Sequence, residues 1–230
     1  MLKIENFEVL GWEHAIRGMR NPMNSWEKSD SNFFDDSEGH VCNICQGRGS
    51  MSLIEMGQND HDLMMRLRNA GTDHRKFMRM ITVYLDITAP LYWWKEFDTY
   101  KVGTVANSCS TMHKIHAKEF TLDDFSTEHL YPEVREAFEN TIIKYLNEAR
   151  KTYNFLSDTP SKKDAWWQMI QLLPSSYNQK RTVMLNYEVL ANIYKSRRHH
   201  RLDEWHTLCD WIEELPYSEL ITGKEYEVEE

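Results

Sequence analysis

Three groups of residues in this sequence have types and spacings that could do chemistry. The first is a CxxC pair, Cys42 and Cys45, with His40 two residues before it. Thiolates at this spacing can share a zinc ion, but a structural site needs four ligands and usually a second pair. Cys109 and Cys209 are isolated in the sequence. The ligand count therefore predicts no metal site, and zinc at Cys42 and Cys45 remains the alternative.

Aromatic and cationic residues form the other two groups. The pairs Trp93-Trp94 and Trp166-Trp167 could stack on a flavin or a base. Neighbours on a helix point in different directions, so core packing is the better interpretation. The run RRHH at 197–200 could supply cations and proton donors, or could complement the dipole of its own helix end. Both interpretations of the run stay open, and no P-loop, dinucleotide-binding, serine-hydrolase or zinc-protease motif accompanies it.

The composition describes one domain that can bury a sizeable core, with 230 residues of which 41% are hydrophobic. No apolar run approaches the ~18 residues of a membrane span, and the opening residues lack the pattern of a signal peptide. Four cysteines fit a reducing compartment, so we expect a cytoplasmic protein that does not associate with membranes. The net charge of −9 argues against binding to a nucleic acid polymer, but not to a mononucleotide.

The elements that must position these residues begin with strand patterns. Residues 2–10 are predicted as a strand and 12–19 as a helix, before a polar loop or insertion over 21–50. Asn59 or Asp60 is predicted to cap a short helix that Gly71 closes. The clearest strand ends at Pro90, where a helix follows. Its buried side is predicted to comprise Ile81, Val83, Leu85 and Ile87.

The second half of the chain has helical patterns. After a loop over 101–127, Pro132 is predicted to begin a helix, and further helices are predicted over 161–173, 181–196 and 202–215. The helix that begins at Pro132 is predicted to have an apolar stripe, which comprises Val134, Phe138, Ile142, Tyr145, Ala149 and Tyr153. Strands followed by helices indicate a mixed α/β fold. We expect a single domain over 1–230, with a polar insertion at about 32–57 and an acidic tail at about 223–230.

Four segments, in the same order, resemble the flavin-dependent thymidylate synthases (the ThyX family). The early helix and loop of that family, with Ala-Val-Arg-x-x-Arg, are similar to HAIRGMRNPMNSWEKSDS at 14–31. Its Gly-His-x-x-Pro-Phe-x-His turn and following strand resemble AGTDHRKFMRMITVYLDITAP at 70–90. The place of its signature, Arg-Gln-x-x-Arg-His-Arg-x7-Ser, is taken by LYWWKEFDTYKVGTVANSCS at 91–110. The most specific match is the family's Asn-x5-Asn-x4-Arg, which lies within 172–197. The helix that follows is loosely similar to the family's helix with Ala-Gln-Trp-Glu-Ile.

This resemblance implies a central, largely antiparallel sheet flanked by helices and an enzyme that methylates dUMP reductively to dTMP. It implies FAD as cofactor, NADPH and methylenetetrahydrofolate as co-substrates, and a homotetramer. Arg197 would be the catalytic residue and would bind the uracil. The resemblance places flavin contacts at His74, Tyr100, Lys101, Asn107, Asn186 and Asn192. It places nucleotide contacts at Glu96 and Ser110, besides Arg197.

The signature segment departs from the family's pattern. Its Arg-His-Arg corresponds to 99–101, Thr-Tyr-Lys, so only the last cation is kept. The arginine after the signature serine becomes Met112, and the arginine before Leu-Pro becomes Ile170 or Gln171. Neither Thr nor Met can replace an arginine fork on a phosphate. Two alternatives therefore stay open: a catalytically silent or regulatory nucleotide-binding relative, and a related enzyme that modifies another pyrimidine nucleotide.

Overall fold

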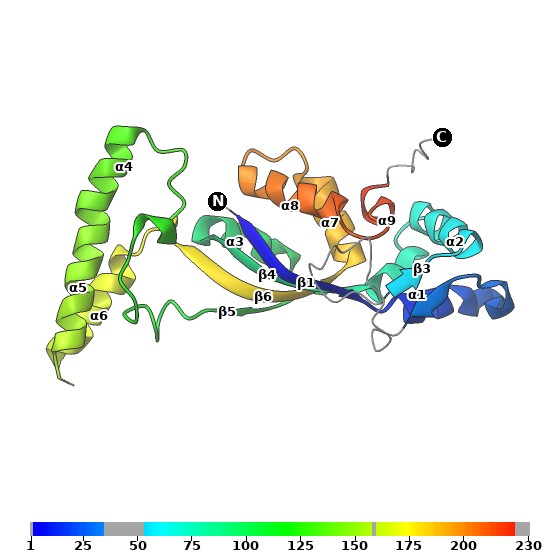
Figure 1. Ribbon diagram of the computed structural model, residues 1–230, viewed down its shortest axis with the longest axis horizontal. Helices are drawn as coiled ribbons and strands as arrows, with labels where there is room; N and C mark the ends of the chain where they lie inside the picture. The colour runs from blue at the N-terminus through cyan, green and yellow to red at the C-terminus, as the bar shows by residue number, and fades with distance from the viewer. Residues whose placement is uncertain (1, 35–52, 158–159, 224–230) are drawn as a thin grey trace. The chain divides into compact units, whose positions relative to one another are not determined.

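The computed structural model describes residues 2–34, 53–157 and 160–223 (Figure 1). The chain forms two compact units. The first unit consists of Met1–Lys3, Thr88–Thr99 and Asn107–Arg181, and the second unit of Ile4–Ile87, Tyr100–Ala106 and Thr182–Glu230. The predicted CxxC pair and most of the predicted acidic tail lie outside the described residues.

A four-stranded antiparallel sheet draws residues from both units. Its strands are β1 (Lys3–Leu10), β4 (Thr82–Pro90), β6 (Asn178–Asn186) and β5 (Val105–Ser108), in the order β1-β4-β6-β5. Helices accompany the sheet in each unit. This architecture confirms the predicted mixed α/β fold with a largely antiparallel sheet.

The strand β4 and the helix after it follow the predicted pattern. All four alternating apolar residues, from Ile81 to Ile87, are buried, because successive side chains of a strand point to opposite faces. Pro90 ends the strand, and α3 (Leu91–Phe97) begins at the next residue. Trp93 and Trp94 on α3 are both buried, which confirms core packing for this pair.

The predicted helix over 181–196 is wrong in its first part. Residues 178–186 form β6, and α7 (Tyr187–Arg197) begins only at Tyr187. Val183 and Leu185 are buried while Thr182 is exposed, which is the two-residue period of a strand. The apolar residues of this strand are directly followed by those of α7. The predicted helix therefore began too early, within the strand. Asn186 stands at the junction and is therefore not on the helix itself.

The predicted loop over 101–127 contains the strand β5 and a 3-10 turn, η6 (Leu122–Asp124). All four residues of β5 are exposed. A short strand with no buried face has no apolar alternation, so nothing in the residue pattern marked it. The strand is nevertheless fixed at the edge of the sheet by pairing with β6.

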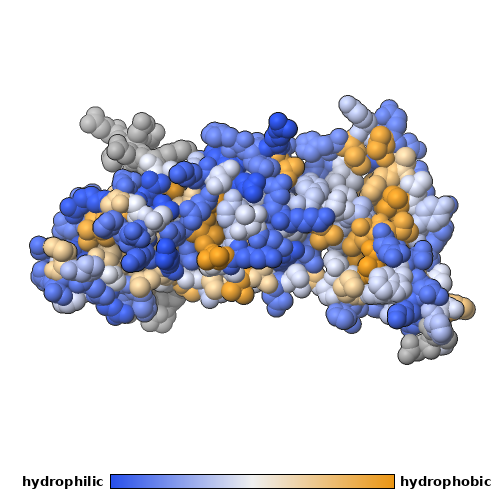
Figure 2. All heavy atoms as spheres, turned by 180° about the vertical axis from the view of Figure 1, so that it is seen from behind, coloured by the Kyte–Doolittle hydropathy of each residue, from blue (hydrophilic) through white to orange (hydrophobic). Residues whose placement is uncertain are grey.

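The first unit has a helical core of its own. Its helices are α4 (Pro132–Phe138), a π-helical turn η7 (Glu139–Ile143), α5 (Lys144–Phe155) and α6 (Pro160–Leu172). Four residues of the predicted stripe pack against this core, but Val134 and Tyr145 are 48% and 57% exposed. The wider π turn rotates the face of the helix, so Ile143 and Leu146 are the residues buried instead. Apolar residues of these helices also reach the surface (Figure 2).

The second unit packs its helices around α7. As predicted, α1 (Trp12–Arg20) buries the apolar face that begins with Trp12. Two further helices, α8 (Asp203–Glu213) and α9 (Glu219–Thr222), lie against α7. The remaining elements are η1 (Asn21–Met23), η2 (Trp26–Lys28), the antiparallel pair β2 (Asn32–Phe34) and β3 (Leu53–Glu55), α2 (Gln58–Asn69), η4 (Arg75–Arg79) and, divided between the units, η5 (Asp98–Tyr100).

The helix α2 is capped from a distant part of the chain. The carboxylate of Asp30 accepts the backbone N–H groups of Asn59 and Asp60, at 3.0 and 3.1 Å. The prediction that Asn59 or Asp60 caps this helix is therefore wrong, because both residues lie inside its first turn. Gly71 follows the last turn with φ of 109°, which confirms the predicted end.

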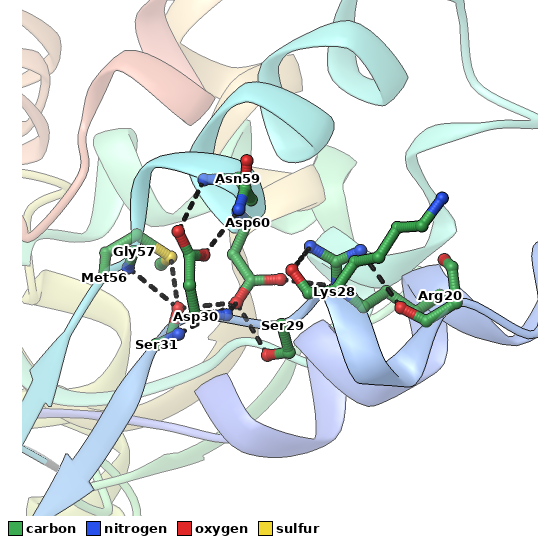
Figure 3. A network of polar contacts seen from close by, with 10 residues as sticks. Arg20, Lys28, Ser29, Asp30, Ser31, Met56, Gly57, Asn59 and Asp60 are labelled. Carbon is green, nitrogen blue, oxygen red and sulfur yellow. Dashed lines mark hydrogen bonds and ion pairs between the residues drawn. The ribbon is translucent and has the colours of Figure 1, made fainter.

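Asp60 lies at the centre of a buried polar network (Figure 3). Its carboxylate accepts a hydrogen bond from Nε of Arg20 at 2.6 Å, and both side chains are buried. It also accepts hydroxyl and backbone N–H groups from Ser29, Asp30 and Ser31. Burial alone raises the pKa of Asp60, but these hydrogen bonds outweigh it and hold the pKa below its ordinary value. The ionised carboxylate thus fastens segment 29–31 to α1 and α2.

Candidate functional site

Arg197, the last residue of α7, is held by two aromatic residues. Its Nε donates to Oη of Tyr100 at 3.0 Å. Its guanidinium carbon lies 4.8 Å from the ring centroid of Trp205 and 5.7 Å from that of Tyr100, which is cation–π geometry. Tyr100 ends η5, and Trp205 is buried in the first turn of α8. Side chains of the protein itself therefore hold the guanidinium of this half-buried residue in position.

Trp205 was not predicted as a site residue. The rings of Tyr100 and His200 meet its ring edge-on, at centroid distances of 6.0 and 6.2 Å. The only signal for it was the loose similarity of the following helix to Ala-Gln-Trp-Glu-Ile. That similarity aligned a tryptophan but gave it no role, because the contact with Arg197 forms only when α8 folds back on α7.

The rest of the RRHH run holds α7 to α8. Arg198 forms ion pairs with Asp210 and, at 3.5 Å, with Glu213. The hydrogen bond with Asp210 raises the pKa of Arg198. The carbonyl oxygen of His200 lies 2.6 Å from Nε2 of His206. These contacts favour a structural role for the second arginine and the last histidine of the run.

A second polar cluster lies nearer the start of α7. Glu188 is only 8% exposed and forms ion pairs with Arg75 and Arg79, both on η4. One turn further along α7, Oδ1 of Asn192 accepts Nη2 of Arg75 at 3.2 Å. His74 immediately precedes η4 and is exposed. The structure therefore joins Asn192, which was predicted, with two arginines and a glutamate, which were not, and the predicted His74 is the sequence neighbour of one of these arginines.

The loop after Tyr100 packs against the start of α7. Oδ1 of Asn186 caps this helix by accepting the N–H of Val189 at 3.0 Å. Gly103 has φ of 81°, and a Cβ atom there would lie 3.1 Å from Cγ2 of Val189 and 3.2 Å from Nδ2 of Asn186. Only glycine fits this close approach without strain. Lys101, on this loop, is exposed. It belongs to the same unit as Asn186, Asn192 and Arg197.

Three predicted residues belong to the first unit. Glu96 is half-buried on α3, and Asn107 is exposed on β5. Ser110 follows β5, and its Oγ accepts the N–H groups of Met112 and His113 at 3.1 and 2.8 Å. This local hydrogen bonding fixes the turn after the strand and leaves the hydroxyl proton for an acceptor.

Within residues 2–34, 53–157 and 160–223, no three His, Cys, Asp or Glu side chains are placed to hold a metal ion. Cys109 is exposed, whereas burial raises the pKa of Cys209 to about 11, so its thiol stays protonated and unreactive at neutral pH. No helix in the described part of the chain is long and apolar enough to cross a membrane.

No protein-family model matches the sequence, and no curated protein matches it. Solved structures do match over nearly the whole chain. Thymidylate synthase X from Helicobacter pylori, solved with FAD and dUMP, has a TM-score of 0.65 at 14% identity and covers 97% of this chain and 98% of its own. A second structure of that flavin dependent enzyme complexed with FAD and dUMP has a TM-score of 0.62 at 17% identity, covering 96% and 98%.

The UMP/dUMP methylase PolB from Streptomyces cacaoi, bound with 5-Br dUMP, has a TM-score of 0.57 at 11% identity and covers 97% of this chain and 95% of its own. At such low identities the comparisons establish the fold. The chain has a ThyX-like fold, as its four similar segments predict.

Proposed function

We propose that the protein is an enzyme that binds FAD and a pyrimidine nucleotide and methylates dUMP reductively to dTMP. Methylenetetrahydrofolate and NADPH are the expected co-substrates. The observation that carries the proposal is the guanidinium of Arg197, which Tyr100 and Trp205 fix in place. It occurs in a fold shared with an enzyme whose structures hold FAD and dUMP.

Arg197 is suited to polarise a uracil ring. A guanidinium carries five N–H donors in a rigid plane, and the contact with Tyr100 uses Nε. A cation already fixed in place stabilises negative charge that develops on the ring without having to reorganise. Arg197 would therefore bind the pyrimidine and favour the charged transition state, with no covalent nucleophile required.

The donor set of the second unit fits a flavin. Asn192, His74 and Lys101 are all exposed, and the amide of Asn186 lies beside the loop that carries Lys101. The two amides can hydrogen-bond the flavin ring, and His74 can lie beside that ring. Tyr100 can stack on the flavin, and Lys101 can form an ion pair with a flavin phosphate. When bound, the reduced flavin would supply the hydride that reduces the transferred one-carbon group, and NADPH would then reduce the flavin again. The residues of the chain bind and orient the reactants.

The predicted residues of the first unit complete the proposal. The hydroxyl of Ser110 would donate to the nucleotide phosphate, because its oxygen already accepts two backbone N–H groups. Glu96 would accept from the nucleotide sugar, and Asn107 would contact the flavin.

Methylation of another pyrimidine nucleotide, such as UMP, is the second candidate function. It is favoured by the similarity to a UMP/dUMP methylase. The loss of signature arginines at 99–101 also favours a changed nucleotide site. In this case the same residues would act on a different substrate.

Association into a homotetramer is also proposed. In the first unit, three apolar residues close together at the start of α4 are exposed: Leu130 at 38%, Tyr131 at 78% and Val134 at 48%. Apolar side chains gathered on a surface commonly mark an interface between proteins. Light scattering on a size-exclusion column should give four times the mass of one chain, and a mass of one chain at micromolar concentration would contradict this proposal.

The proposal is tested by incubating purified protein with FAD, NADPH, methylenetetrahydrofolate and dUMP, and measuring dTMP by mass spectrometry. We expect dTMP only in the complete mixture. UMP in place of dUMP tests the second candidate. Protein that takes up no FAD and produces no methylated nucleotide would overturn the proposal in favour of a catalytically silent relative.

A further inference from the structure

Arg75 connects two residues on one face of α7. Its Nη2 donates to Oδ1 of Asn192 at 3.2 Å, and its Nε donates to Oε1 of Glu188 at 3.4 Å. Glu188 and Asn192 are four positions apart, so they are neighbours on the helix surface. The side chain of Arg75 is only 17% exposed. A single, largely desolvated guanidinium therefore spans both side chains.

This contact decides how the amide of Asn192 is oriented. Oxygen and nitrogen of an asparagine amide are assigned from the hydrogen bonds that surround them. A guanidinium has donors only, so the amide atom that faces Arg75 must be the oxygen. The NH2 group of Asn192 is then directed away from Arg75, and this side chain is exposed. Arg75 thus converts an ambivalent amide into a hydrogen-bond donor at the surface.

The charges around Arg75 keep its guanidinium in place. The buried carboxylate of Glu188 would be costly without a cation, so Arg75 is held at α7 by electrostatics as well as by geometry. Arg79 also pairs with Glu188, but its side chain is 57% exposed and both of its hydrogen bonds go to that carboxylate. Of the two arginines, Arg75 is the one that joins the carboxylate to the amide.

We propose that Arg75 is a positioning residue for the flavin. It presents the NH2 group of Asn192 as a donor to an acceptor atom of the flavin ring. The inference rests on the proposed function, because it takes Asn192 to be a flavin contact. Without Arg75 the amide can turn and offer its oxygen, which would meet a flavin acceptor unfavourably.

Dissociation constants for FAD, measured by the quenching of flavin fluorescence, test this inference. In Arg75→Gln we expect FAD to bind about 10-fold more weakly, which corresponds to ~1.4 kcal/mol. Arg79→Gln is the matched control, because it removes a partner of Glu188 and leaves the contact with Asn192. Its FAD affinity should change by less than about 3-fold, the smaller effect of an exposed ion pair.

A double-mutant cycle separates positioning from a general structural effect. If Arg75 acts through Asn192, Arg75→Gln should weaken FAD binding by less than about 2-fold once Asn192→Ala is present. Additive losses in the double variant would overturn the inference. If Arg75→Gln does not fold, Arg75→Lys replaces it, because lysine keeps a charge for Glu188 but has no fork to span both residues.

The two proposals fail in different ways. Wild-type protein that binds no FAD overturns the proposed function, and the inference with it. Wild-type protein that binds FAD with the same affinity as folded Arg75→Gln overturns the inference alone.

Discussion

Two clusters of the second unit pair an arginine with a carboxylate, and they differ in whether a polar side chain of the cluster is exposed to solvent. Around Asp60, the carboxylate accepts from Arg20 and from segment 29–31, and the ion pair is buried (Figure 3). Around Glu188, the carboxylate is buried but the cluster extends to Asn192, which is exposed. A closed cluster fastens the chain, whereas a cluster with an exposed amide can also contact a ligand.

The site of Arg197 is of the second kind. Tyr100 and Trp205 hold its guanidinium, and the residue is half-buried. Arg198, the next residue, has its contacts with Asp210 and Glu213 on α8. Neighbouring arginines thus have separate tasks, and substitutions should distinguish effects on stability from effects on the reaction.

The largest effect is expected when the closed cluster is broken. Asp60→Asn removes the charge that faces the buried Arg20, and breaking a buried ion pair costs about 3–5 kcal/mol of unfolding free energy. Urea denaturation measures this loss. Asp62→Asn, on the exposed side of the same helix, is the control and should cost less than about 1 kcal/mol. Equal stabilities of the two variants would show that the network does not fasten the unit.

Arg197→Ala should act on the reaction instead. We expect kcat/KM for dUMP to fall about 10²- to 10³-fold, because a fixed charge that stabilises the transition state is lost. Arg198→Ala is the matched control and should retain kcat/KM within about 3-fold while losing stability. Steady-state kinetics on both variants would contradict this assignment if Arg198→Ala were the more impaired.

Trp205→Phe should have an intermediate effect. The smaller ring weakens the cation–π contact with Arg197, and a loss of ~1.4 kcal/mol in the placement of the guanidinium lowers kcat/KM about 10-fold. Trp211→Phe changes a tryptophan on the same helix that contacts Phe7, and it should leave kcat/KM within about 2-fold. A similar loss in both variants would mean that α8 as a whole is disturbed.

The smallest effect is a pH dependence of stability. Because the pKa of Asp60 lies below its ordinary value in the folded protein, its contribution is fully present above the unfolded pKa of about 3.9. That contribution is lost as the pH falls through the lower, folded pKa. The unfolding free energy of the wild type, measured by denaturation from pH 5 downward, should therefore decline more steeply than that of Asp60→Asn. Parallel curves would contradict the lowered pKa.

Local patterns in the sequence predicted the parts of the fold that local physics determines. The alternation in β4 and the apolar face of α1 each depend on residues a few positions apart. The four similar segments predicted the ThyX-like fold, although identity to the matching structures is 11% to 17%. The strand β6 was mistaken for helix because its apolar residues continue into those of α7.

Contacts between distant positions could not be predicted in this way. Asp30 caps a helix that begins 28 residues later, and Arg75 reaches a side chain 117 positions away. The contact between Trp205 and Arg197 likewise needs α8 to fold back on α7. The sequence could name Arg197 and Asn192 as candidates through the resemblance, but not the residues that hold them.

A crystal structure of the protein with FAD and dUMP would test the central claim most directly. The proposal predicts the uracil ring within hydrogen-bond distance of the Arg197 guanidinium, with Tyr100 and Trp205 still in contact with it. A nucleotide bound elsewhere in the molecule, with Arg197 facing solvent, would contradict the proposed role.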